Sequence, residues 1–182
     1  MKILITGISG LLGSKFIQHS KVICGTYLNE YPYVTRNGIR FFKIDITKRS
    51  EVMKLSDLNF NVIVHTAALT GVDECEEKQN LAWDINVNGT DNVAMLAEKK
   101  NAMLVYISTD YVFDGKKGNY SENDKPRPIN FYGKTKYEGE KIVSKLQSYL
   151  IARVSTLFGY HPTKLNFVLW ILKNLRNNNE IK

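Results

Sequence analysis

The sequence has few cysteines and few prolines, which excludes several structural classes. It contains 2 Cys and 4 Pro in 182 residues, and Cys24 and Cys75 follow no spacing typical of a metal site or a redox motif. With 43% hydrophobic and 24% charged residues the composition is globular, which excludes a disulfide-stapled, collagen-like or disordered protein. Cysteines without a pairing pattern are typical of a reducing compartment, so we expect a cytoplasmic protein, and we assign no metal site.

Long hydrophobic runs are also absent. The longest apolar block, from Phe167 to Leu172, is far shorter than the roughly 20 residues of a membrane-spanning helix. The apolar run within residues 1–7 is too short for a signal peptide, so we expect no membrane partner. The net charge is +7, but the basic residues are spread along the chain without interleaved aromatics, which argues against a nucleic-acid partner.

Short apolar runs alternate with helical stretches along the chain. Mostly apolar runs of five to seven residues predict strands buried on both faces, at Lys2–Thr6, Lys21–Tyr27, Arg40–Ile44, Val62–Thr66, Ala102–Ser108 and Ser148–Val154. Helices are predicted at Leu11–His19, Arg49–Leu58, Leu81–Lys99 and Tyr132–Leu146. This alternation predicts an α/β fold, a Rossmann-like doubly wound parallel sheet. The segment Asp114–Asn130 is expected to be a long loop, which in a compact domain is usually functional.

Three glycines follow the first predicted strand at the spacing of a dinucleotide-binding turn. Gly7, Gly10 and Gly13 lie where that strand gives way to a helix. In this pattern the first glycine permits a tight turn, the second lets a pyrophosphate approach the backbone, and the third lets helix and strand pack closely. The start of the helix then offers N–H groups to the phosphates. The alternative is a strand–helix turn that binds no ligand.

The end of the second predicted strand does not identify the dinucleotide. A fold that prefers NAD usually carries Asp or Glu about 20 residues beyond the glycines, whereas Tyr27 stands here. No arginine for a 2′-phosphate stands beside it, although Arg36 could fold back, so we expect both coenzymes to bind, with NADPH preferred. Asp45, just after the third strand, either meets an adenine edge or is an N-cap or turn carboxylate before Thr47.

A tyrosine four residues before a lysine occurs at three places, Tyr132/Lys136, Tyr137/Lys141 and Tyr160/Lys164. Pro162 lies inside the third pair and argues against a helix there. The other two share one predicted helix, and only the first pair lies at its start, near the carboxyl ends of the strands where open α/β sheets bind ligands. We therefore select Tyr132 and Lys136 as the functional pair.

Such a pair can deliver a proton to a carbonyl group. A phenol has a pKa near 10, and an ammonium one helical turn away would lower that pKa toward the working range. Thr109, at the end of the fifth predicted strand, could polarise the carbonyl, although in isolation a threonine here more often caps a turn. The residues thus predict a catalytic group of Thr109, Tyr132 and Lys136.

Together these residues resemble the extended short-chain dehydrogenase/reductases, and among them the dTDP-4-dehydrorhamnose reductases. The segments that carry the resemblance are 65–73 (HTAALTGVD), 108–115 (STDYVFDG) and 128–136 (PINFYGKTK), together with Asn86 and with Asn166-Phe167. The resemblance extends over essentially the whole chain. It implies NADPH-dependent reduction, with NADH possible, of a 4-keto-6-deoxy nucleotide sugar.

The resemblance also implies roles for individual residues. Tyr132 would be the proton donor, Lys136 would bind the nicotinamide ribose, and Thr109 would contact the substrate carbonyl. The implied cofactor residues are Gly7, Ser9, Gly10, Leu11, Leu12, Gly13, Tyr27, Asp45, Ile46, Thr66, Ala67, Ala68, Asn86, Ser108, Tyr132 and Lys136. The implied substrate residues are Thr70, Val72, Asp110, Tyr111, Phe113 and Asn166.

The family pattern continues beyond the end of this sequence. Residues 1–160 are expected to form the NAD(P)-binding Rossmann domain and residues 161–182 the start of a substrate-binding lobe that is largely absent. We therefore expect a fragment, or a chain that completes its fold with a partner, which binds dinucleotide but has poor activity. An apolar helix at Leu165–Leu172 should associate, as in a homo-oligomer, unless it folds back onto the sheet.

A non-catalytic alternative has the same motifs. They are also similar to those of the NADP-binding regulatory β subunit of methionine adenosyltransferase and of redox-sensing NADP-binding regulators. The presence of Thr109, Tyr132 and Lys136 together favours the enzyme.

Overall fold

The computed structural model describes residues 1–19, 21–163 and 166–177. Its strands are β1 (Ile3–Thr6), β2 (Val22–Tyr27), β3 (Arg40–Lys43), β4 (Val62–His65), β5 (Met103–Thr109) and β6 (Tyr149–Val154). They form one six-stranded sheet in the order β3-β2-β1-β4-β5-β6, and every neighbouring pair is parallel. The predicted doubly wound sheet is confirmed, and each strand begins and ends within one residue of its predicted bounds. The prediction that the strands are buried on both faces is wrong for the two edge strands, because β3 and β6 have no neighbour on one side and their residues are exposed or half-buried.

The helices mostly follow the prediction, with one interruption. The α-helices are α1 (Leu11–Lys15), α2 (Arg49–Met53), α3 (Val72–Glu77), α4 (Gln79–Trp83), α5 (Gly89–Lys100), α6 (Phe131–Val143) and α7 (Phe167–Arg176). Short 3₁₀ helices are η1 (Phe16–Gln18), η2 (Lys54–Asp57) and η4 (Asp110–Val112). The helix predicted as continuous over Leu81–Lys99 is broken by a π-helical turn, η3 (Asp84–Asn88), and such turns often occur at functional sites. Helix α3 had not been predicted.

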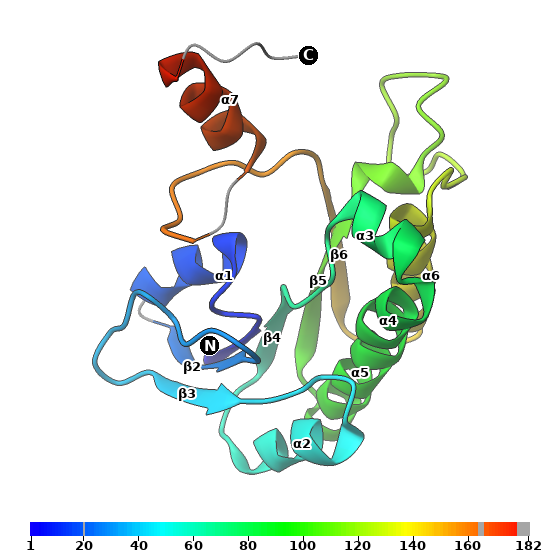
Figure 1. Ribbon diagram of the computed structural model, residues 1–182. Coiled ribbons are helices and arrows are strands. Elements are labelled where there is room, and N and C mark those ends of the chain that lie inside the picture. The colour runs from blue at the N-terminus through cyan, green and yellow to red at the C-terminus, as the bar shows by residue number, and fades with distance from the viewer. Residues whose placement is uncertain (20, 164–165, 178–182) are drawn as a thin grey trace.

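Two apolar cores lie on the two faces of the sheet. On one face Leu4, Ile63 and Leu104 pack against the side that α2, α5 and α6 cover (Figure 1). On the other face a smaller core, which includes Ile5 and Ile17, lies on the side of α1 and η1. Because helices cover both faces, the carboxyl ends of the strands are the open edge on which ligands can bind.

Helix α7 stands away from the sheet (Figure 1). Asn166 caps it by accepting a hydrogen bond from the Leu169 N–H at 3.2 Å, and none of its residues is buried. The alternative in which this helix folds back onto the sheet is therefore wrong in this structure. The predicted start at Leu165, the pair member Lys164 and the chain end 178–182 lie outside the described residues. In the part of the chain that the structure describes, no helix has the length and apolar character to span a membrane.

Candidate active site

The turn between β1 and α1 has the backbone geometry that its glycines predict. Gly7 has φ +69°, and its carbonyl accepts a hydrogen bond from the Gly10 N–H at 3.0 Å. A Cβ on Gly13 would lie 2.3 Å from the Gly7 carbonyl oxygen, so the close packing of helix on strand requires glycine there. A Cβ on Gly10 would meet only that oxygen, at 3.2 Å. Backbone conformation therefore explains Gly7 and close packing explains Gly13, whereas Gly10 leaves backbone open toward a ligand.

A cleft of about 930 Å³ runs along the carboxyl ends of the strands and includes the glycine turn. The expected cofactor residues that line it are Gly7, Ser9, Gly10, Leu11, Leu12, Gly13, Tyr27, Asp45, Ile46, Thr66, Ala67, Ala68, Ser108, Tyr132 and Lys136. The expected substrate residues that line it are Thr70, Val72, Asp110, Tyr111 and Asn166, and Thr109 lines it as well. The fold thus brings residues from all parts of the chain to one cleft. Two expected residues do not line it, namely Asn86, expected at the cofactor, and Phe113, expected at the substrate.

Asn86 connects two structural elements behind the cleft. It lies in the π-helical turn η3 and is 1% exposed. Its Oδ1 accepts from the Leu69 N–H at 2.8 Å, and its Nδ2 donates to the Leu69 carbonyl at 2.9 Å and to Thr135 Oγ1 at 3.0 Å. Since these partners occupy the amide, Asn86 ties the loop after β4 to α6 in this structure.

Tyr132 is positioned by the first turn of α6. Asn130 caps the helix, with Oδ1 accepting from the Gly133 N–H at 2.7 Å. A Cβ on Gly133 would lie 2.2 Å from the Tyr111 carbonyl oxygen, so this helix start packs directly on η4. The ring of Tyr132 meets the ring of Tyr111 edge-on, with centroids 6.0 Å apart. The proposed proton donor therefore stands on a fixed helix start that faces the end of β5.

Thr109 has both of the roles considered for it. Its Oγ1 accepts a hydrogen bond from the Tyr111 N–H at 3.2 Å, which caps η4, and its hydroxyl donates to Asp110 Oδ1 at 3.1 Å. Burial is the main influence on the pKa of Tyr132 and raises it, and the Thr109 hydroxyl acts against this by lowering it. Thr109 thus caps a turn and stands beside the phenol at the cleft.

The proton equilibria of the pair differ from the prediction. Burial raises the pKa of Tyr132 to about 12, and burial lowers the pKa of Lys136 to about 7, against an opposing effect of the Glu140 carboxylate. The ammonium of Lys136 is not among the groups that shift the pKa of Tyr132. The prediction that it lowers this pKa is wrong in this structure, because removal of the phenol from water outweighs the charges around it.

A partly buried ion pair lies beside Ser108, which lines the cleft. The Ser108 hydroxyl donates to Glu140 Oε1 at 2.5 Å, and Arg153 donates to both carboxylate oxygens of Glu140 at 2.9 and 2.7 Å. The Arg153 guanidinium lies 5.0 Å from the ring centroid of Phe113, which stacks on Tyr120 at 4.3 Å. Phe113, an expected substrate residue, thus packs at the base of the long loop.

Asp45 forms a turn and also lines the cleft. Its Oδ1 accepts from the Thr47 N–H at 3.0 Å and from the Thr47 hydroxyl at 2.7 Å, and Lys48 Nζ lies 3.7 Å from Oδ2. The N-cap position of α2 is Lys48, so Asp45 is a turn carboxylate and not an N-cap. A carboxylate oxygen in this place can still meet an adenine edge.

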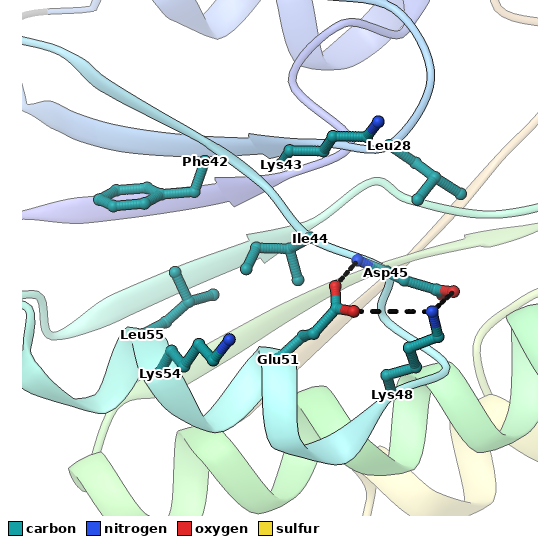
Figure 2. A pocket seen from close by; sticks show the side chains of 9 residues that line it. All are labelled: Leu28, Phe42, Lys43, Ile44, Asp45, Lys48, Glu51, Lys54 and Leu55. Carbon is teal, nitrogen blue, oxygen red and sulfur yellow. Dashed lines mark hydrogen bonds and ion pairs between the residues drawn. The ribbon is translucent and has the colours of Figure 1, made fainter.

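A smaller pocket of about 630 Å³ opens beside Asp45, between β3 and α2 (Figure 2). It shares Leu28, Ile44 and Asp45 with the cleft. Its other lining residues are Phe42, Lys43, Lys48, Glu51, Lys54 and Leu55. The pocket therefore continues the cleft at the end where an adenine is expected, and it brings three lysines to that end.

Arg36 does not fold back toward the cleft. Its Nη2 donates to the Val22 carbonyl at 2.8 Å, at the start of β2, whereas the cleft lies at the opposite end of that strand. A 2′-phosphate in the cleft is thus out of reach of this arginine in the conformation seen here.

Residues after β6 line the cleft but were not expected there. They include Ser155, Thr156 and Leu157. His161 lies over the glycine turn, with Nε2 3.0 Å from the Ser9 carbonyl oxygen. The position of Ser155–Leu157 at the carboxyl end of the last strand was a signal that could have identified them.

The whole chain is similar to known proteins. The family model described as the RmlD substrate binding domain matches residues 1–182. A dTDP-4-dehydrorhamnose reductase of Aggregatibacter actinomycetemcomitans is 35% identical over 179 residues, which are 97% of this chain and 58% of that protein. Methionine adenosyltransferase 2 subunit beta of Rattus norvegicus is 38% identical over 168 residues, which are 87% of this chain and 47% of that protein.

A solved structure is also similar. The dTDP-4-dehydrorhamnose reductase of Bacillus anthracis, crystallised in complex with NADP, superposes with a TM-score of 0.83 at 38% identity. The superposition covers 100% of this chain and 62% of that one. The chain thus spans less than two thirds of the length of each of these relatives.

Proposed function

Because the chain belongs to the RmlD substrate binding domain family, we propose that it forms the cofactor-binding half of an NADPH-dependent reductase. The proposed substrate is a 4-keto-6-deoxy nucleotide sugar, with dTDP-4-dehydrorhamnose reduced to dTDP-rhamnose. The observation that carries the proposal is that Thr109, Tyr132 and Lys136 line the same cleft as the glycine turn. In this proposal residues 1–160 form the Rossmann domain and residues 161–182 begin the substrate-binding lobe.

The residues of the cleft fit a dinucleotide. Gly10 offers open backbone for a pyrophosphate, and about 930 Å³ is within the usual size of a small-molecule site. Bound NADPH would supply a hydride to the carbonyl carbon of the substrate. Asp45 and Ile46 would hold the adenine, and Lys136 the nicotinamide ribose. NADH is also proposed to bind, because Tyr27 at the end of β2 selects for neither cofactor.

The catalytic residues have distinct tasks. With a pKa of about 12, Tyr132 carries its proton at neutral pH, as the donor to a nascent alkoxide must. Thr109, 5% exposed and beside that phenol, would hold the carbonyl oxygen while the charge develops. Lys136, with a pKa of about 7, is charged in an increasing fraction of molecules as the pH falls below neutrality.

Tyr132→Phe tests this assignment. The substitution should lower kcat for oxidation of NADPH by the 4-keto nucleotide sugar at least about 100-fold, because the proton donor is lost. The Kd for NADPH should stay within about twofold of wild type. Tyr137→Phe is the matched control, since Tyr137 is the tyrosine of the second tyrosine–lysine pair on α6 and lies outside the cleft lining. Its ring centroid is 4.6 Å from Lys141 Nζ. Wild-type turnover of the Tyr132 variant would refute the role.

A second candidate is a regulatory subunit that binds NADP without turnover. It is supported by the 38% identity with methionine adenosyltransferase 2 subunit beta. Stable binding of NADPH without oxidation, in the presence of the 4-keto nucleotide sugar, would favour this candidate over the reductase.

We also propose that copies of the chain associate through α7. Its exposed apolar side chains are Phe167, Trp170, Leu172 and Leu175, of which Phe167 is 59% exposed. Leu172→Glu should lower the average mass in light scattering, and a wild-type protein that is monomeric at high concentration would contradict the proposal. A cytoplasmic location fits Cys24 and Cys75, which are both buried and free of a disulfide.

A further inference from the structure

The ammonium of Lys136 lies over an aromatic ring that the proposed reaction does not use. Lys136 Nζ is 4.1 Å from the ring centroid of Tyr106, well within the range of a cation–π interaction. Both residues are buried, since Lys136 is 3% and Tyr106 is 0% exposed. Cation–π attraction is strongest when the charge has lost its water, so this contact is in a place where it matters most.

Tyr106 is held in place from both ends. Its backbone belongs to β5, and its hydroxyl donates to the Lys136 carbonyl at 3.3 Å. A Cβ on Gly139 would lie 2.2 Å from the Tyr106 hydroxyl oxygen, so α6 approaches this side chain as closely as glycine allows. Tyr106 therefore fixes the distance between β5 and the helix that carries Lys136.

His65 of β4 and Glu140 of α6 also interact electrostatically with Lys136. On β4, burial lowers the pKa of His65 to about 3, so this imidazole is neutral and adds no repulsion at working pH. On α6, Glu140 attracts the ammonium but is shared with Arg153 of β6 and Ser108 of β5.

The remaining facing groups are uncharged at neutral pH. Burial raises the pKa of Tyr106 far above its ordinary value and that of Tyr132 to about 12. A neutral phenol keeps the negative ring face that attracts a cation.

We propose that Tyr106 is a positioning residue, whose ring holds the charged Lys136 side chain at the cleft, where the proposed function would have it bind the nicotinamide ribose. The inference rests on the proposed function for its catalytic meaning, but the contact itself can be tested without turnover. Loss of the ring face should favour the neutral amine and free its rotation, whereas loss of the hydroxyl alone should not.

The test is an NMR titration of the Lys136 Cε resonance in the 182-residue chain labelled with ¹³C-lysine, assigned by its absence in Lys136→Met. Tyr106→Leu should lower the pKa of Lys136 by about one pH unit, and Tyr106→Phe should leave it within about 0.3. Leu104→Ala is the control for packing, because Leu104 lies on the same strand and the same face and is also fully buried. If Tyr106→Leu does not fold, Tyr106→Met keeps the bulk without a ring face and takes its place.

A double-mutant cycle gives a second measurement. Tyr106→Leu should weaken NADPH binding about five- to tenfold in wild type and not at all in the Lys136→Met background. The proposal is overturned if the pKa of Lys136 is the same in Tyr106→Leu and Leu104→Ala, if Tyr106→Phe shifts it as much as Tyr106→Leu, or if the two losses of affinity add. Failure of the reductase proposal would instead appear as the expected pKa shifts of Lys136 in the Tyr106 variants, together with no oxidation of NADPH by the wild-type protein.

Discussion

Two alanine substitutions in the glycine turn should have different effects. Gly10→Ala should weaken NADPH binding, whereas Gly13→Ala should lower the stability of the fold. A Cβ at Gly10 would meet only the Gly7 carbonyl oxygen, at 3.2 Å, and the φ of Gly10 is −76°, which any residue adopts. Alanine is a poorer N-cap than glycine by at most about 1 kcal/mol, so Gly10→Ala should lower Tm by no more than about 4 °C. The new methyl group would nevertheless stand in the cleft where a pyrophosphate must approach the backbone. The affinity for NADPH should fall at least about tenfold.

The corresponding change at Gly13 acts through packing. Its Cβ would lie 2.3 Å from the Gly7 carbonyl oxygen and 2.8 Å from Ile8 Cα, whereas ordinary contacts begin at 3.4 Å. Because both neighbours are backbone, α1 has to move away from β1. Overpacking of this kind costs about 1–3 kcal/mol or more, which for a chain of this length is a fall in Tm of about 2–12 °C or more.

The assay compares thermal unfolding and NADPH titration on the same samples. Gly71→Ala is a useful control, because Gly71 is outside the cleft lining and its Cβ would meet Glu74 at a tolerable 3.3 Å. The reasoning is refuted if Gly10→Ala binds NADPH as tightly as wild type, or if Gly13→Ala is as stable as Gly10→Ala. Either outcome would mean that the spacing of the glycines does not divide into a ligand role and a packing role.

Two further predictions concern the cofactor and acid stability. Both coenzymes should bind, with NADPH preferred because three lysines line the pocket at the expected adenine end. Lys43→Gln should reduce the preference for NADPH over NADH in fluorescence titrations. A tenfold preference of the wild-type protein for NADH would contradict this prediction. His65 has a folded pKa of about 3 against an ordinary 6.5, so the unfolded chain binds the extra proton as pH falls from 6.5 toward 3. The free energy of unfolding should therefore decrease as the pH is lowered through this range, and the decrease should be steeper in wild type than in His65→Gln by up to about 1.4 kcal/mol per pH unit. Equal slopes of the free energy of unfolding against pH, measured by urea unfolding of the two proteins, would rule this out.

The sheet could be predicted from the sequence more closely than the helices. Strands buried on both faces give continuous apolar runs whose ends are sharp, as at Ile3–Thr6 and Val62–His65. The interruption of the helix predicted over Leu81–Lys99 has no such signal, because a π-helical turn keeps the composition of its neighbours. In the structure the turn carries Asn86, whose amide joins the loop after β4 to α6. The π-helical turn is thus explained by tertiary contacts of Asn86, which the local sequence pattern does not show.

The sequence predicted most of the residues that line the candidate site, but it did not predict the pKa values of those residues. Parallel strands place their carboxyl ends on one edge, so residues at the end of a strand or just after it, such as Thr109 and Thr66, had to lie on the same edge as the glycine turn. The proton equilibria depend on burial, which the sequence does not state. An ammonium one turn from a phenol predicts a low phenol pKa in water. In the structure Tyr132 is half-buried and Lys136 is buried, and desolvation has the largest effect on the pKa of each.

The structural and the functional interpretations of single residues turn out not to exclude each other. Thr109 caps η4 and stands beside the Tyr132 phenol, and Asp45 closes a turn with Thr47 while it lines the cleft. The cause is geometric, because strand ends must turn immediately and the polar side chains that satisfy a turn are short and held by several hydrogen bonds. A hydroxyl or carboxylate held in this way has lost its rotamer freedom before any ligand arrives, so less entropy is lost on binding. In an open α/β sheet, turn formation is therefore itself a means of positioning the groups that bind and react.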